Sequence, residues 1–317
     1  MTRYWRILGY LAAVAFAGYF IWFSLHSLDL VMLKAVLSPN VLAAVVLASA
    51  MYASIIPMTG WAWGRLLAGQ NESWRVSRLS AILAVTQLAK YVPGNVAQHA
   101  TRAALSIRNG MAPKSLFFTV VQETIMAAAA SVLVGVLMLV ASGHGADHLP
   151  DSARAALVWS VPLLVIAVLS LVSIRVAPQE AACSPSRMVR LVGRMGGLPG
   201  AKVAFPAFAV YALNYVLIGV GLWVVGRASG LPEALDLPLV TAAFALSWLI
   251  GFLAPGAPAG LGVREGIMVV LLSGSAGNEY LLVFVLLARL VTMLGDAINF
   301  LLGTVWFAVD AKRSGAR

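Results

Sequence analysis

Apolar stretches long enough to cross a bilayer occur along the whole chain, and they restrict it to very few folds. A spanning helix needs about 20 predominantly apolar residues, and six segments reach roughly that length: 7–25, 41–64, 115–142, 155–174, 203–226 and 280–308. Hydrophobic residues make up 61% of the 317 residues and charged residues only 11%. We therefore expect an all-α polytopic membrane protein, with residues 1–317 forming a single integral membrane domain.

Two further apolar regions, 79–108 and 238–273, are each interrupted near the centre by a Pro-Gly pair, Pro93-Gly94 and Pro255-Gly256. Proline removes a backbone donor and glycine accepts a sharp reversal, so both pairs break a helix. Arms of about 14 residues cover only ~21 Å, which is short of the ~30 Å hydrocarbon core. These regions predict two re-entrant helical hairpins; the alternative, in which every arm spans, gives a ten-helix protein.

The two interrupted regions carry the same polar pattern, because an arginine follows each proline after nine residues, Arg102 in the first and Arg264 in the second. This duplication predicts a first repeat at about 41–142 and a second at about 203–308, joined by a linker at about 175–202. Broken helices at matching positions of two repeats are typical of transporter binding sites.

The distribution of cations gives the orientation, since cytoplasmic loops are rich in Lys and Arg. Outside the apolar regions, one side of the membrane receives Lys34, Arg154 and Arg227, and the other receives the remaining cations. We expect both termini in the cytoplasm. The segment count then makes the hairpins enter from opposite faces, so the repeat is an inverted one.

Charged residues within the apolar framework are few, and each costs roughly 2.5–3.5 kcal/mol at mid-membrane unless it is paired or binds a ligand. Glu123 and Arg289 lie at similar depths in the helices that follow the two hairpins, and Asp296 lies two turns beyond Arg289 on the same face. The sequence predicts a Glu123–Arg289 pair that is either structural or gates a cavity. Glu265 and Asp296 belong to the same group of gating or paired charges.

The hairpin arginines suggest an anion site, because free amides at a helix start and a guanidinium both bind phosphate oxygens. The residues assigned to substrate binding are those of the two reversals and their cations: Lys90, Pro93, Gly94, Arg102, Pro255, Gly256, Gly260, Gly262 and Arg264. In the alternative interpretation, Arg102 and Arg264 only reach toward lipid headgroups at the hairpin mouths.

Other functional classes find little support in the sequence. The formal charge of +10 comes without a separate basic domain or a nucleic-acid-binding signature, so no nucleic acid is expected. Cys183 is the single cysteine, and the four histidines form no helical cluster, so no metal site and no cofactor are expected.

The sequence around several of these residues resembles the motifs of a known family. The run from Pro255 to Gly266, PGAPAGLGVREG, followed by Arg289, is similar to the signature of the lysylphosphatidylglycerol synthase transmembrane family, and Tyr91–Gly94 with Arg102 and Glu123 resembles its first-half motif. The resemblance covers residues from about 35 to 310. It implies a membrane domain related to the flippase part of bacterial aminoacyl-phosphatidylglycerol synthases, and therefore a location in a bacterial cytoplasmic (inner) membrane. We expect no soluble aminoacyltransferase domain within residues 1–317. Ala257-Pro258-Ala259 departs from the Gly-Gly that is usual in the family signature.

Together these features favour a lipid flippase or translocase, and not an enzyme, that moves a phospholipid or polyprenyl-phosphate-linked headgroup. Its partners would be the membrane and an anionic lipid or lipid-linked sugar, with Arg102 and Arg264 holding the phosphate. Two other interpretations remain: a membrane enzyme acting on lipid phosphates, and a non-transporting partner of a glycosyltransferase or lipid-modifying enzyme.

Overall fold

The computed structural model describes residues 38–92, 97–142, 152, 159, 161–163, 200–230, 232, 235–254 and 258–315. The expected span 7–25, most of 155–174 and most of the linker 175–202 lie outside these residues. So do four residues of the reversals, Pro93, Gly94, Pro255 and Gly256. Within the described part, the regular elements are all helices.

Four long helices form the frame of the molecule: α3 (Pro39–Ala68), α6 (Pro113–Ala141), α10 (Ala201–Ala228) and α13 (Asn278–Gly315). Each is long and apolar enough to cross a membrane. They confirm the spans expected at 41–64, 115–142, 203–226 and 280–308. Proline in the first turn of α3 and of α6 suits the helix start, where its missing donor has no helical acceptor to lose.

Between the long helices lie two pairs of short ones. The first pair is α4 (Val76–Thr86), extended by the 3₁₀ turn η1 (Gln87–Tyr91), and α5 (Ala97–Arg108). The second is α11 (Leu237–Leu253) and α12 (Val263–Leu272), with the turn η2 (Pro258–Gly260) between them. The α-helices α4, α5 and α12 have 11, 12 and 10 residues, so each rises only ~15–18 Å. The members of each pair contact each other, as the arms of a hairpin do.

The second reversal follows from its backbone angles. Ala259, Gly260 and Gly262 have φ values of 51°, 72° and 76°, in the left-handed region that glycine adopts at little cost. Gly262 is the N-cap of α12, so the chain leaves the turn directly into the second arm. This explains why the break needs a glycine-rich segment.

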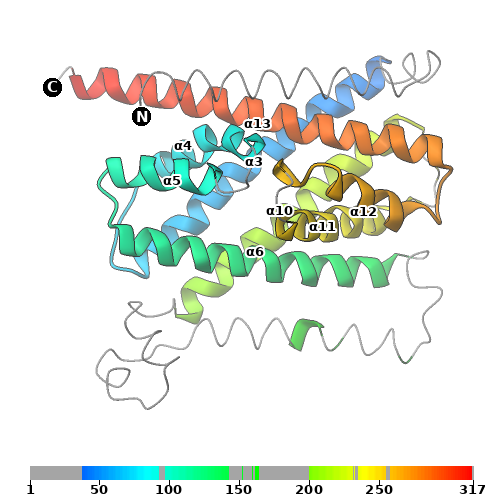
Figure 1. Cartoon of the computed structure of the whole chain (residues 1–317), viewed down its shortest axis with the longest axis horizontal. Helices are drawn as coiled ribbons and strands as arrows, with labels where there is room; N and C mark the ends of the chain where they lie inside the picture. Colours follow the sequence, from blue (N-terminus) through cyan, green and yellow to red (C-terminus); the bar gives the residue numbers. More distant parts are fainter. Residues whose placement is uncertain are drawn as a thin grey trace.

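The two halves contact each other in a matched way. α3 packs along α10; the first hairpin arm α4 packs against α13, and its counterpart α11 packs against α6. The two reversals also meet, because η1 contacts η2. Figure 1 shows that α6 and α13 run in opposite directions, as do α3 and α10, and that α4 with α5 and α11 with α12 occupy opposite ends of the molecule. These matched contacts and opposed directions are the ones that the predicted inverted repeat requires.

Glycines on the long helices allow the first arm of each hairpin to pack closely against them. A side chain at Gly60 of α3 would collide with Ser80 of α4, and one at Gly219 of α10 would collide with Thr241 of α11. Gly303 and Gly135 make the corresponding close approaches to α4 and α11 from α13 and α6. Small residues let helices approach closely in a membrane, where packing replaces the hydrophobic effect. Both hairpins therefore pack against the long helices through the same kind of close contact at glycine.

Candidate functional site

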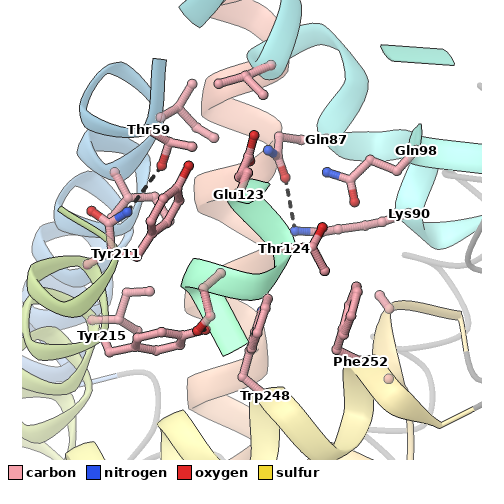
Figure 2. A pocket seen from close by; sticks show the side chains of 18 of the residues that line it. Thr59, Gln87, Lys90, Gln98, Glu123, Thr124, Tyr211, Tyr215, Trp248 and Phe252 are labelled. Atoms are coloured by element: carbon pink, nitrogen blue, oxygen red, sulfur yellow. Dashed lines mark hydrogen bonds between the residues drawn. The ribbon is translucent and has the colours of Figure 1, made fainter. Parts of the chain in front are cut away.

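A cavity of about 240 Å³ lies between the two halves, where the hairpin reversals meet. Figure 2 shows side chains converging on it from α3, the first hairpin, α6, α10 and α11. Its charged and polar lining comprises Thr59, Gln87, Lys90, Gln98, His99, Arg102, Glu123, Thr124, Asn214 and Arg264, together with the hydroxyls of Tyr52, Tyr211 and Tyr215. Such a concentration of polar groups between long apolar helices makes this cavity the candidate binding site.

Arg102 forms a two-pronged ion pair with Glu123 on one wall of the cavity. Its Nη1 and Nη2 donate to the two carboxylate oxygens at 3.1 and 2.6 Å. The guanidinium also lies over the face of Trp63, 3.9 Å from the ring centroid. Parallel hydrogen bonds and an aromatic face both fix a guanidinium in place. Arg102 is thus already neutralised by a partner on α6.

Lys90 and Tyr91, in η1, both bind Asp296 of α13. The Lys90 ammonium lies 2.7 Å from the carboxylate, and the Tyr91 hydroxyl donates to its Oδ2 at 2.6 Å. Lys90 also donates to Tyr52 and to Gln87 at 3.2 and 3.3 Å. Asp296 is fully buried, so these bonds replace the water that its charge would otherwise require. They attach the first reversal to the second half of the protein.

Arg289 lies on α13 beside the second reversal. Its Nε is 3.6 Å from Glu265 of α12, and its Nη1 donates to the Ala259 carbonyl at 3.5 Å. The sequence predicted a pair between Glu123 and Arg289, but the structure gives each of them a different partner. The hairpin arms explain the difference, because α5 and α12 present charges of their own that reach these two residues.

Arg264 differs from the other three cations of the apolar framework, Lys90, Arg102 and Arg289, since no carboxylate among the described residues forms an ion pair with it. It lines the cavity, and its Nε has no hydrogen-bond partner. Its guanidinium lies 5.9 Å from the centroid of Trp248. The stem of its side chain passes Gly251 and Gly260 so closely that a side chain at either position would collide with it.

The formal charge of the site follows from these pairs. Seven ionisable residues were predicted inside the apolar framework; four are cations and three are carboxylates. Lys90, Arg102 and Arg289 each have a carboxylate neighbour. One positive charge is left in excess, and it belongs to Arg264.

Several groups that line the cavity were not among the predicted site residues. The Tyr211 hydroxyl, the Asn214 carbonyl oxygen and His99 Nδ1 are buried and lack a hydrogen-bond partner. Asn214 donates through its amide nitrogen to Thr59 at 3.1 Å, which leaves its oxygen unused. Asn214 carries a signal that sequence reading could have used, because an amide inside an apolar span is rare.

The glycines of the second reversal take different places. Gly260 lines the cavity, whereas Gly262 caps α12 two residues before Arg264. The first helical bond of α12 runs from the Gly266 amide to the Gly262 carbonyl at 3.0 Å. The amides of the first turn, which includes Arg264, therefore have no acceptor within the helix.

Comparison with known families gives one match. The family model described as "Lysylphosphatidylglycerol synthase TM region" matches residues 10–298. The match includes both hairpins and every ionisable residue discussed above. A search among curated proteins finds no match.

Proposed function

The chain belongs to the lysylphosphatidylglycerol synthase transmembrane family, and from this premise we propose that it is a lipid translocase that moves a phosphate-bearing headgroup across the bilayer. The membrane would be the bacterial cytoplasmic membrane, with both termini in the cytoplasm. The headgroup would pass through the cavity while the acyl or prenyl chains stay in the lipid. Exposed apolar side chains on the long helices, such as Val46, Phe117 and Leu301, suit contact with lipid.

One observation carries the proposal: Arg264, which forms no ion pair with a carboxylate among the described residues, lines a cavity that lies between the two halves of the molecule. A buried cation at membrane depth is costly unless an anion compensates it. Arg264 and the free amides at the start of α12 offer charge-assisted donors of the kind that bind phosphate.

The two hairpin arginines have different roles in this proposal, because their partners in the structure differ. Arg102 is occupied by Glu123, so in this proposal it shapes the wall of the cavity, and Arg264 makes the main phosphate contact. The hairpins reach the cavity from opposite ends of the molecule. Movement of one repeat against the other would expose the site to each face in turn, as in other inverted-repeat transporters.

The test is lipid transport in proteoliposomes that contain the full chain and acyl-labelled phosphatidylglycerol. Arg264→Gln should lower the initial rate roughly ten- to hundredfold, because a charge-assisted hydrogen bond contributes about 1.5–3 kcal/mol. Arg108→Gln is the matched control, since Arg108 is an exposed arginine at the end of α5, away from the cavity lining.

The proposal fails if the wild-type protein moves no phospholipid above protein-free vesicles, or if Arg264→Gln and Arg108→Gln behave alike. Thin-layer analysis of the same lipids for chemical turnover separates a translocase from an enzyme that acts on lipid phosphates.

A further inference from the structure

Resting on the proposed function, we infer that the cavity selects a hydroxyl-bearing phosphodiester headgroup, a polyol or a single sugar with one negative charge, over a headgroup that carries an ammonium. Three features of the cavity lead to this substrate class: its charge, its unpartnered polar atoms and its aromatic wall.

The formal charge of the cavity favours an anionic headgroup over one that carries an ammonium. Glu123, the carboxylate that lines the cavity, already holds Arg102 through both oxygens. Asp296 is occupied by Lys90 and Tyr91. Glu265 is the neighbour of Arg289, so each of the three carboxylates of the site among the described residues already has a cation beside it, and an ammonium would meet the excess positive charge of Arg264. A phosphodiester carries one negative charge, which matches the excess.

The polar atoms of α10 that have no hydrogen-bond partner are suited to bind a hydroxyl group of the ligand. Tyr211 and Asn214 are only 5% and 7% exposed, and the Tyr211 hydroxyl and Asn214 Oδ1 have no hydrogen-bond partner among the described residues. An amide oxygen accepts a hydrogen bond, whereas a phenol both donates and accepts. A ligand hydroxyl also both donates and accepts, so it can satisfy both atoms. A phosphate has acceptor oxygens and no proton for Asn214 Oδ1.

An aromatic wall, formed mainly by Trp248 and Phe252 of α11, lines another side of the cavity from Tyr211 (Figure 2). The rings of Trp248 and Phe252 stack with an interplanar angle of 4° and a centroid separation of 5.4 Å, and Tyr215 meets Trp248 edge to face. The faces of such rings are electron-rich and attract the polarised C–H groups of a polyol or sugar. The volume of about 240 Å³ lies below the usual range for drug-sized ligands, which fits one small headgroup and not an oligosaccharide.

The experiment compares lipids that differ in one property at a time. Phosphatidylglycerol and phosphatidylethanol have the same charge but differ in hydroxyls, and lysyl-phosphatidylglycerol adds ammonium groups. A prenyl phosphoglucose distinguishes a sugar from a glycerol source. Binding to the full-length protein in detergent is measured by native mass spectrometry, and transport by the vesicle assay described above.

We expect phosphatidylglycerol or the phosphoglucose lipid to bind about three- to tenfold more tightly than phosphatidylethanol, the effect of one hydrogen bond. Lysyl-phosphatidylglycerol should bind most weakly. Tyr211→Phe should reduce the preference for the hydroxyl-bearing lipid, while Tyr280→Phe, at an exposed position of α13, should leave the preference unchanged.

Equal binding of phosphatidylglycerol, the phosphoglucose lipid and phosphatidylethanol overturns the inference, and so does binding of the lysyl lipid as tight as that of its parent. The two proposals fail separately. Absence of transport with selective binding refutes the translocase and leaves the headgroup assignment intact. Transport of all the lipids at one rate supports the translocase and overturns the headgroup assignment.

Discussion

Arg102 and Arg264 occupy matching positions in the two hairpins, yet their surroundings differ in charge. In the first half, the hairpin supplies the arginine and the following helix supplies Glu123. In the second half, the hairpin supplies Glu265 and the following helix supplies Arg289. This reversal leaves Arg264 without the carboxylate that its counterpart has. The excess cation of the cavity is therefore a product of broken symmetry between the repeats.

The position of Arg264 depends on the absence of side chains beside it. Gly251→Ala would place a methyl group against the Arg264 stem, so we expect the guanidinium to be displaced and transport in vesicles to fall at least about tenfold. The helix itself should tolerate the change, because alanine is a better helix former than glycine by roughly 1 kcal/mol.

Gly266→Ala is the control for that substitution. Gly266 is a helical residue of α12, and nothing lies within 4 Å of a side chain built there. Transport should match the wild type. Equal losses from the two substitutions would show that the effect of Gly251→Ala does not come from contact with Arg264.

At the scale of elements, the first hairpin is attached at its tip and not only along its arms. Both side chains that bind Asp296 belong to η1, and the carboxylate comes from α13, in the other half. Packing of α4 on α13 continues this contact along the arm. The bonds from Lys90 and Tyr91 to Asp296 thus link the position of the first reversal to a helix of the second half.

Asp296→Asn should loosen that tip. The substitution leaves the Lys90 ammonium partly buried without its carboxylate, and breaking a buried pair costs about 3–5 kcal/mol. We expect a lower midpoint of thermal unfolding in detergent and faster amide hydrogen exchange in residues 87–91. Glu72→Gln is the control, because Glu72 lies in the α3–α4 loop and accepts a hydrogen bond from the nearby Trp74, and this substitution should change neither property. Unchanged exchange in η1 would contradict the proposed attachment.

The sequence predicted the elements that depend on the local sequence, and it failed where contacts between distant segments decide the outcome. The four long helices followed from apolar stretches of spanning length, and the short arms followed from Pro-Gly breaks. The pairing of charges did not follow, because Glu123 and Arg289 match in depth along the chain while their partners are set by which hairpin arm packs beside each helix. Tyr211 and Asn214 were missed for a similar reason. Which face of α10 meets the cavity depends on packing with α3 and α11.

At the scale of the molecule, the matched contacts and opposed directions of the two halves predict that the hairpin mouths open at opposite faces of the membrane. The test uses Cys183→Ser as a cysteine-free background. Lys114→Cys, just after the first hairpin, and Ser273→Cys, just after the second, are both at exposed positions. A membrane-impermeant thiol reagent should label position 114 from the cytoplasm and position 273 from outside. Labelling of both from one side would exclude an inverted repeat.

The single excess charge of the cavity also bears on how membrane voltage acts on the protein. A bound lipid with one negative charge brings the formal charge of the site to zero, whereas the empty site carries +1. Moving one elementary charge through 100 mV involves about 2.3 kcal/mol. For a site exposed in turn to each face, the voltage would therefore bias the return of the empty protein, while the lipid-loaded step would be electrically silent.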